Sequence, residues 1–369
     1  MHRHVKTINC AAGFSLLELL VSLAVMLVLT AAAFVLLTGS IRVANSAYYM
    51  TDAEESMRAA HELINRDLTS TGDGLKSIGN MTTPLGFAST YLTRTTLTDV
   101  SDPNHHQLGL LTSDDAIPAN TAVPQGAAAA TFLPNSDRMS LISQDKDFNG
   151  GNPISVLAGT ITVAGSDTKI DVGAANIGLF QVGEIYTVVA GSSAAFGLIT
   201  SITPATNTIT MTDGDALGLN QTGPLAPVSR VSGVAGGVST QNAAIIRLQI
   251  IQYYVTSTGM LMRRVFGVKG GAFMETAVAE HVTNLQFRFQ TNISGGNGFI
   301  TQPITSITST VQQSALREVE TTIAVETVRA VNRITNPNAN DSTNGKQTIQ
   351  TTTATTVRNL QFGANAREQ

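Results

Sequence analysis

The first part of the chain is an almost uninterrupted run of apolar side chains. Residues 14–37 are nearly all apolar, and no charged residue occurs over residues 19–41. Neither proline nor glycine interrupts residues 14–37, so nothing in the sequence forces a kink. At about 1.5 Å per residue, a helix of this length spans a hydrocarbon core of about 30 Å. The pattern therefore predicts one membrane-spanning helix.

The same helix is predicted to continue beyond the membrane with one apolar face. After residue 50, apolar residues recur at intervals of three or four, and charged residues lie between them. This spacing is typical of a helix that packs one face on a protein core. The apolar stripe consists of Met50, Ala53, Met57, Ala60, Ile64 and Leu68. Because the sequence Thr-Gly-Asp-Gly at 71–74 favours a helix end, we expect one helix over residues 14–71.

The rest of the chain is predicted to form a β-rich head. Residues 72–136 contain several prolines and no clear period, so loops with short elements are expected there. Residues 137–219 contain short runs of strand-forming residues separated by turn residues, as in a small β-module. Residues 220–240 are rich in Gly, Pro, Ser and Val, which predicts a linker or long loop.

The last part of the chain carries the strongest strand signals. Residues 241–369 are expected to form a C-terminal β-sheet region, in which 244–255 and 260–266 form a hairpin around a Thr-Ser-Thr-Gly turn. The predicted fold class is therefore α+β. A long N-terminal helix packs on a β-rich head that contains an inserted small β-module.

Composition excludes several classes of protein. The chain of 369 residues is 43% hydrophobic and 13% charged, which is too apolar for a disordered protein. Its net charge of −4 gives no electrostatic basis for binding nucleic acid, and a single cysteine cannot form an intrachain disulfide. The sequence contains no nucleophile elbow, P-loop, His-Glu-x-x-His motif or cysteine pair. We therefore predict that the protein is not an enzyme.

One carboxylate interrupts the apolar run. Glu18 lies near the start of the predicted membrane helix, where a charged group costs up to a few kcal/mol. Arg3 and Lys6 precede the run, so the N-terminus is expected in the cytoplasm and the head outside. A cleaved secretory signal is the alternative, but this run is longer than usual and lacks an Ala-x-Ala-like site at its end. An acid in this position needs a partner.

A short motif surrounds Glu18 at the start of the apolar run. Gly13 is followed by Phe14, and Glu18 stands five residues after the glycine in the sequence GFSLLELLV. This motif resembles the class III signal of type IV pilins and type II secretion pseudopilins. The resemblance implies that a prepilin peptidase removes the leader, residues 1–13, by cutting between Gly13 and Phe14, and methylates the new amine. It also implies that Glu18 pairs with the α-amine of a neighbouring subunit. Cleavage would remove Cys10, the only cysteine.

Four looser motifs occur later in the chain. They are LINRDL at 63–68, MRRV at 262–265, VAEHVTNLQFRF at 278–289 and TTVRNL at 355–360. These motifs are similar to those of the PilW branch of minor pilins. The resemblance implies a minor type IV pilin that helps to initiate pilus assembly or forms part of the tip complex. It implies a single-pass protein of the bacterial inner membrane with a periplasmic head, which later enters a pilus or pseudopilus. Its partners would be prepilin peptidase, other minor and major pilins, and the inner-membrane assembly machinery.

Two other functions remain open from the sequence. A J-type minor pseudopilin of a type II secretion system would share the helix ending and the order of strands. A membrane-tethered binding or adhesion module would instead act through its head alone. Co-purified partners distinguish a pseudopilin from a minor pilin. A head that still functions when it is cut from its helix would indicate the binding module.

The sequence DKDFNG has the spacing of a calcium-binding loop. Asp145, Asp147 and Asn149 supply oxygen side chains at alternate positions, as a Ca²⁺ site requires. However, Val156 stands where an EF-hand has its bidentate glutamate, and the preceding segment is predicted to be a strand rather than a helix. A polar turn is the favoured interpretation, with a Ca²⁺ site as the alternative. No other cofactor is expected.

Overall fold

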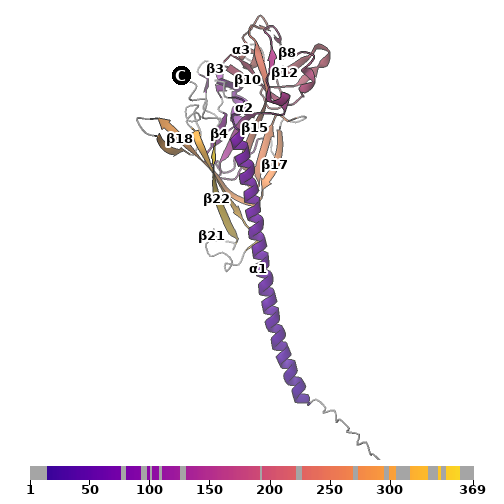
Figure 1. Cartoon of the computed structure of the whole chain (residues 1–369), viewed down its shortest axis with the longest axis vertical. Coiled ribbons are helices and arrows are strands. Elements are labelled where there is room, and N and C mark those ends of the chain that lie inside the picture. The colour runs from indigo at the N-terminus through magenta and orange to yellow at the C-terminus, as the bar shows by residue number, and fades with distance from the viewer. Residues whose placement is uncertain are drawn as a thin grey trace, which may run out of the picture.

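The protein consists of one long helix and a β-rich head, as Figure 1 shows for the computed structural model of the chain. The structure describes residues 15–75, 80–92, 98–99, 102–107, 110–124, 130–191, 193–221, 227–268, 273–294, 299–304, 316–330, 340–341 and 346–357. Helix α1 (Leu16–Ser70) projects from the head, and its N-terminal half lies clear of the rest of the chain. The predicted α+β class is confirmed.

The second half of α1 packs on the head through the predicted stripe. Ala53, Met57, Ala60, Ile64 and Leu68 are all buried and belong to one core cluster with strand residues of the head. Burying a side chain such as Ile64 or Leu68 contributes about 1.5–3 kcal/mol. The helix ends at Ser70, as its sequence predicted, and Gly72 follows with a φ of 75° that favours glycine. The stripe therefore fixes which face of α1 meets the head.

The strands of the head form three sheets among the described residues. The largest is built around β15 (Ala243–Val255), which pairs antiparallel with β16 (Leu261–Phe266), β5 (Arg138–Gln144), β6 (Ile154–Val156) and β9 (Ile185–Ala190). The remaining strands of this sheet are β17 (Phe273–Ala279), β10 (Ser193–Leu198), β1 (Asn80–Pro84), β3 (Asp102–Gln107), β2 (Thr98–Asp99) and β4 (Leu111–Asp114). The expected hairpin is present as β15 and β16, and Gly259 closes its turn at a φ of 79°.

A second sheet lies at the end of the head opposite the free half of α1 (Figure 1). Its strands are, in order, β11 (Ser201–Thr203), β12 (Thr208–Thr212), β8 (Asp167–Asp171), β7 (Ile161–Ala164), β14 (Val238–Ser239) and β13 (Val234–Ala235). The third sheet has the order β19 (Phe299–Ile304), β18 (Val282–Ser294), β20 (Leu316–Glu326), β22 (Gln347–Thr356) and β21 (Asn340–Asp341). The short α-helices are α2 (Leu85–Thr90) and α3 (Pro227–Val231). The 3-10 helices are η1 (Phe148–Gly151), η2 (Ile177–Leu179) and η3 (Pro204–Thr206).

The strands within residues 137–240 are divided between two of the sheets. Residues 137–219 are shared between two sheets, because β5, β6, β9 and β10 pair within the sheet around β15. Strand β9 is buried at nearly every position, as expected of a central strand covered on both faces. Residues 220–240 supply β13 and β14, joined by Gly236 and Gly237 at positive φ, which is a two-residue hairpin turn.

A buried carboxylate, Asp137, connects three segments of the head. It is 1% exposed, and its two oxygens accept the backbone N–H groups of Ala116 at 3.0 Å and Phe287 at 2.7 Å. Its own N–H donates to the carbonyl of Leu285 at 2.8 Å. Burial, with a smaller contribution from Asp115, raises the pKa of the Asp137 carboxyl from 3.8 to about 6.

This raised pKa predicts a pH-dependent stability. The folded protein binds the Asp137 proton more tightly than the unfolded chain, so this group stabilises the fold as the pH falls through about 6. Between about pH 7.5 and about pH 5, we expect the unfolding free energy of the wild type to gain about 1 kcal/mol relative to Asp137→Asn. Denaturant unfolding of both proteins at the two pH values measures this gain.

Comparing the wild type with Asp137→Asn cancels the contributions of other titrating groups to the pH dependence of stability. Burial lowers the pKa of His61, which weakens the fold on acidification, but it does so in both proteins. A constant difference in unfolding free energy between the two proteins across this pH range would contradict the prediction.

Candidate assembly site on the N-terminal helix

The N-terminal half of α1 is a large uncovered apolar surface. Its leucine, valine, methionine, phenylalanine and isoleucine side chains from Leu16 to Val43 are 48–84% exposed. Among the described residues, α1 is the one helix long and apolar enough to cross a membrane. A helix that is apolar on every side, with no protein around it, belongs in lipid or in a bundle of other helices.

The hydroxyl groups within this apolar surface are satisfied by the helix itself. Four side chains each donate to a backbone carbonyl three or four residues earlier, at 2.7–3.0 Å, and these are Ser22, Thr30, Thr38 and Ser40. In hydrocarbon, a polar group without a hydrogen-bond partner costs several kcal/mol. Because these four groups need no water, they are compatible with a helix in lipid or packed among other helices.

Glu18 lies in the first turn of α1 and takes part in its N-cap. The Ser15 hydroxyl accepts the Glu18 N–H at 3.1 Å, and the Glu18 carboxylate accepts the Ser15 N–H at 3.1 Å. This reciprocal arrangement is a capping box, and the helix dipole also favours a negative charge there. The Glu18 carboxylate is therefore compatible with the start of the apolar helix, because it takes part in the N-cap.

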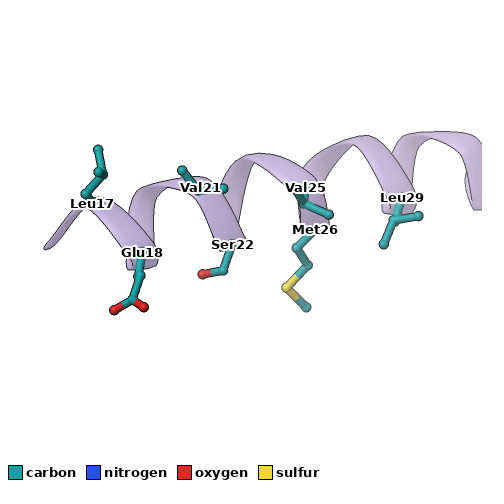
Figure 2. Close-up of a pocket in the computed structure, with 7 residues that line it drawn as sticks. All are labelled: Leu17, Glu18, Val21, Ser22, Val25, Met26 and Leu29. Atoms are coloured by element: carbon teal, nitrogen blue, oxygen red, sulfur yellow. The ribbon is translucent and has the colours of Figure 1, made fainter. Parts of the chain in front are cut away.

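Glu18 shares one side of the helix with residues that a partner helix could contact. In Figure 2, the side chains of Glu18, Ser22, Met26 and Leu29 point to the same side. These residues form an open surface that is apolar apart from the carboxylate and the Ser22 hydroxyl. Chemically, this surface can hold a cation at one end and apolar groups along the rest. The predicted processing residues, Gly13 and Phe14, lie outside the described residues.

A second polar site lies where α1 meets the head. Asp67 is 5% exposed, and its carboxylate accepts the Tyr253 hydroxyl at 2.7 Å and the Arg263 Nε–H at 2.7 Å. Burial and the nearby Asp67 charge raise the pKa of Tyr253 above its ordinary value, so the phenol stays a donor. Asp67 was not predicted as a functional residue. Its position within the apolar stripe, as a charged residue between Ile64 and Leu68, is the signal that could have identified it.

Further contacts connect α1 to the last strand of the third sheet. The Thr353 hydroxyl is 2.8 Å from His61 Nδ1, and the Thr355 hydroxyl donates to Asn65 Oδ1 at 2.6 Å. Together with Asp67, these pairs fix α1 against β15, β16 and β22. The helix is therefore attached to the head by directional contacts as well as by its apolar stripe.

The candidate calcium residues take part in other interactions. Asp145 pairs with Arg247, whose NH2 group lies 2.6 Å from the Asp145 carboxylate, and its other oxygen accepts the Asp147 N–H at 2.9 Å. The Asn149 side chain donates to the carbonyl of Asn152 at 3.1 Å. Within the described residues, no group of three or more His, Cys, Asp and Glu side chains is arranged to hold a metal ion. A cation at Asp145 would have to compete with the guanidinium.

Comparison with known families identifies a motif at the N-terminal end of the chain. The family model described as the prokaryotic N-terminal methylation motif matches residues 8–34, which include Gly13, Phe14 and Glu18. No curated protein and no solved structure matches the chain. The motif supports the type IV pilin-like class and indicates the precursor of a type IV pilin or pseudopilin. Proteins with this motif are structural subunits that prepilin peptidase processes and that associate with other pilins.

Proposed function

We propose that this protein is a minor type IV pilin of the PilW kind, which takes part in initiating pilus assembly or in the tip complex. The observation that carries the proposal is an uncovered apolar helix with a carboxylate in its first turn, within the N-terminal methylation motif. Such a helix has no use in a free monomer outside a membrane, because its apolar surface needs lipid or other helices around it. The β-rich head would make the contacts with other minor pilins, and the protein would act as a structural subunit rather than an enzyme.

The proposed mechanism is a neutralisation of charges in an apolar bundle. Prepilin peptidase would cut between Gly13 and Phe14 and methylate the new amine, which leaves an ammonium group at the tip of the apolar helix. Glu18 of one subunit would pair with this ammonium of its neighbour, because each charge alone is costly in lipid. The pair joins residues four positions apart, so it fixes an axial offset of about 6 Å between neighbouring helices.

The same proposal assigns a location and partners. Before assembly, the chain would span the bacterial inner membrane once, with its N-terminus in the cytoplasm and its head in the periplasm. Arg3 and Lys6 in the leader support this orientation. The inner-membrane assembly machinery would then transfer it from the membrane into a pilus or, in a type II secretion system, a pseudopilus. Co-purification with pilus subunits rather than secretion pseudopilins would distinguish these two assemblies.

Mass spectrometry of the N-terminus in the native host tests the proposal. We expect a chain that begins at Phe14 with a methylated α-amine, because the leader of residues 1–13 should be removed. As a control, Gly13→Val should block the cut, since a β-branched side chain at the junction hinders the extended conformation that the peptidase must bind. A chain that remains intact from Met1 in the membrane would contradict the proposed function.

A further inference from the structure

Strand β22 forms an edge of the third sheet. On one side it pairs with β20 along its whole length, from Thr348 opposite Glu326 to Thr356 opposite Glu318. On the other side, the described residues of β21, Asn340 and Asp341, pair with Thr348 and Gln347. Among the described residues, no strand covers the remaining eight positions, residues 349–356, on that side.

The hydrogen-bonding register shows which backbone groups point toward the open side. The Thr327 N–H donates to the Gln347 carbonyl at 2.9 Å, and the Val357 N–H donates to the Arg317 carbonyl at 3.2 Å. The backbone N–H and C=O groups of the odd-numbered residues of β22 therefore point toward β20, because the pattern of an antiparallel ladder repeats every two residues. The backbone N–H and C=O groups of the even-numbered residues point toward the open edge. These residues, all with exposed side chains, are Gln350, Thr352, Ala354 and Thr356.

Nothing in the sequence of β22 protects this edge. The strand reads QTIQTTTATT, and it contains no charged residue, no proline and no glycine. Natural proteins block exposed edges with charges, prolines or bulges, because an open edge pairs readily with another chain. The opposite edge of the same sheet, β19, does contain such a residue, Pro303. The two edges of this sheet therefore differ, and only β22 has the features of an edge that accepts a strand.

We infer that the open edge of β22 pairs with an extended strand from the head of a neighbouring pilin-like subunit. The inference rests on the proposed function, which supplies the neighbour. A row of alternating N–H and C=O groups is matched by the backbone of another strand, which adds to the sheet by main-chain hydrogen bonds. The side chains next to the edge are threonine, glutamine and alanine, so the partner strand is one without charges at the pairing positions.

The attachment of α1 excludes antiparallel pairing between the β22 strands of two copies of this chain. Helix α1 contacts β22 and runs beside it, and His61 and Asn65 hold it to Thr353 and Thr355 (Figure 1). Two β22 strands that pair antiparallel are related by a two-fold axis perpendicular to the sheet, which also reverses one α1 relative to the other. Both helices could not then enter one membrane from the same side. The β22 strand of a second copy is therefore not the antiparallel partner, and we assign the open edge to a strand of a different subunit.

Photocrosslinking in the native host tests this inference. The processed chain contains no native cysteine, so Thr352→Cys provides a single thiol on β22 for a benzophenone-maleimide reagent. The thiol is introduced into the otherwise unchanged chain, into Ala354→Pro and into Ala354→Val. Proline removes the outward N–H of residue 354 and leaves the bonds to β20, whereas valine keeps that N–H and has a similar size. Thr356→Pro, at the last residue of the strand, replaces Ala354→Pro if thermal unfolding shows that the latter is not folded.

We expect the unchanged chain and Ala354→Val to crosslink to a strand of another pilin-like subunit. In the proline variant, the yield of this product should fall about tenfold, because a main-chain hydrogen bond and the close approach of the partner strand are lost. Equal crosslinking in the proline and valine variants would overturn the inference, as would absence of the product from all of them or a product between two copies of this chain. Methylated Phe14 is measured in each variant. If methylated Phe14 is present, any of these contrary crosslinking results contradicts only the edge pairing. If methylated Phe14 is absent, the proposed function is contradicted.

Discussion

Replacing Glu18 with glutamine is expected to leave the leader processed but to reduce incorporation of the chain into a filament or tip complex about a hundredfold. In the proposed assembly, the Glu18 carboxylate neutralises a neighbour's terminal ammonium among apolar helices. Glutamine would leave that ammonium without a counter-ion, which costs several kcal/mol in a medium of low dielectric constant. Incorporation is measured as the fraction of processed chain that co-purifies with sheared filaments.

Glutamine is the decisive substitution because of the N-cap seen in the structure. Glu18 also accepts the Ser15 N–H, and glutamine at this position still completes a capping box. Glu18→Gln therefore removes the charge and keeps the helix start, whereas Glu18→Ala removes both. If the cap were the important feature, Glu18→Gln would be incorporated normally and only Glu18→Ala would fail. Normal incorporation of the glutamine variant would thus contradict the proposed role of the charge.

Replacing Asp67 with alanine is expected to destabilise the protein by about 3–5 kcal/mol. The substitution leaves the Arg263 guanidinium and the Tyr253 hydroxyl without the carboxylate that they contact at 2.7 Å. Removing one partner of a buried ion pair is costly, because the other charge stays in a poorly solvated site. Thermal and denaturant unfolding of the full chain in detergent should show the loss, with a fall in Tm of about 10 °C.

Two further variants separate the ion pair from a general effect on the helix. Glu62→Ala, at an exposed position of the same helix, should change the unfolding free energy by less than about 0.5 kcal/mol. Adding Arg263→Leu to Asp67→Ala should recover part of the lost stability, since it removes the unpaired charge. If the double variant is less stable than Asp67→Ala by the full effect of Arg263→Leu alone, the two side chains are not coupled.

Local patterns in the sequence predict the helix and the hairpin of β15 and β16. The stripe from Ala53 to Leu68 repeats at helical spacing because one face of α1 is buried. The spacing therefore indicates both the helix and its buried face. The hairpin of β15 and β16 is likewise encoded by two strand-forming runs around a short turn ending in Gly259. The carboxylate at position 18 is also evident from sequence, since a charge in an apolar run stands out.

The grouping of strands into sheets could not be derived in this way. Strand β9 pairs with β15, more than fifty residues later, and no local pattern records which distant strand completes its hydrogen bonds. Strands β13 and β14 have two residues each, too few for an alternating pattern, although the Gly-Gly turn between them is a hairpin signal. The contact of Asp67 with Arg263 depends on this same long-range pairing, because β16 reaches α1 only once the sheet has formed.

The continuity of α1 has a mechanical consequence. Its 55 residues form a single unbroken helix, whose lower half is free and whose upper half is fastened to the β-sheets by Asp67, His61 and Asn65. A helix with every turn hydrogen-bonded resists stretching, so a pull or twist applied at its base is carried along its axis to these fastenings. In the proposed assembly, an axial force applied at the membrane end of α1 would therefore be transmitted to the head through these contacts.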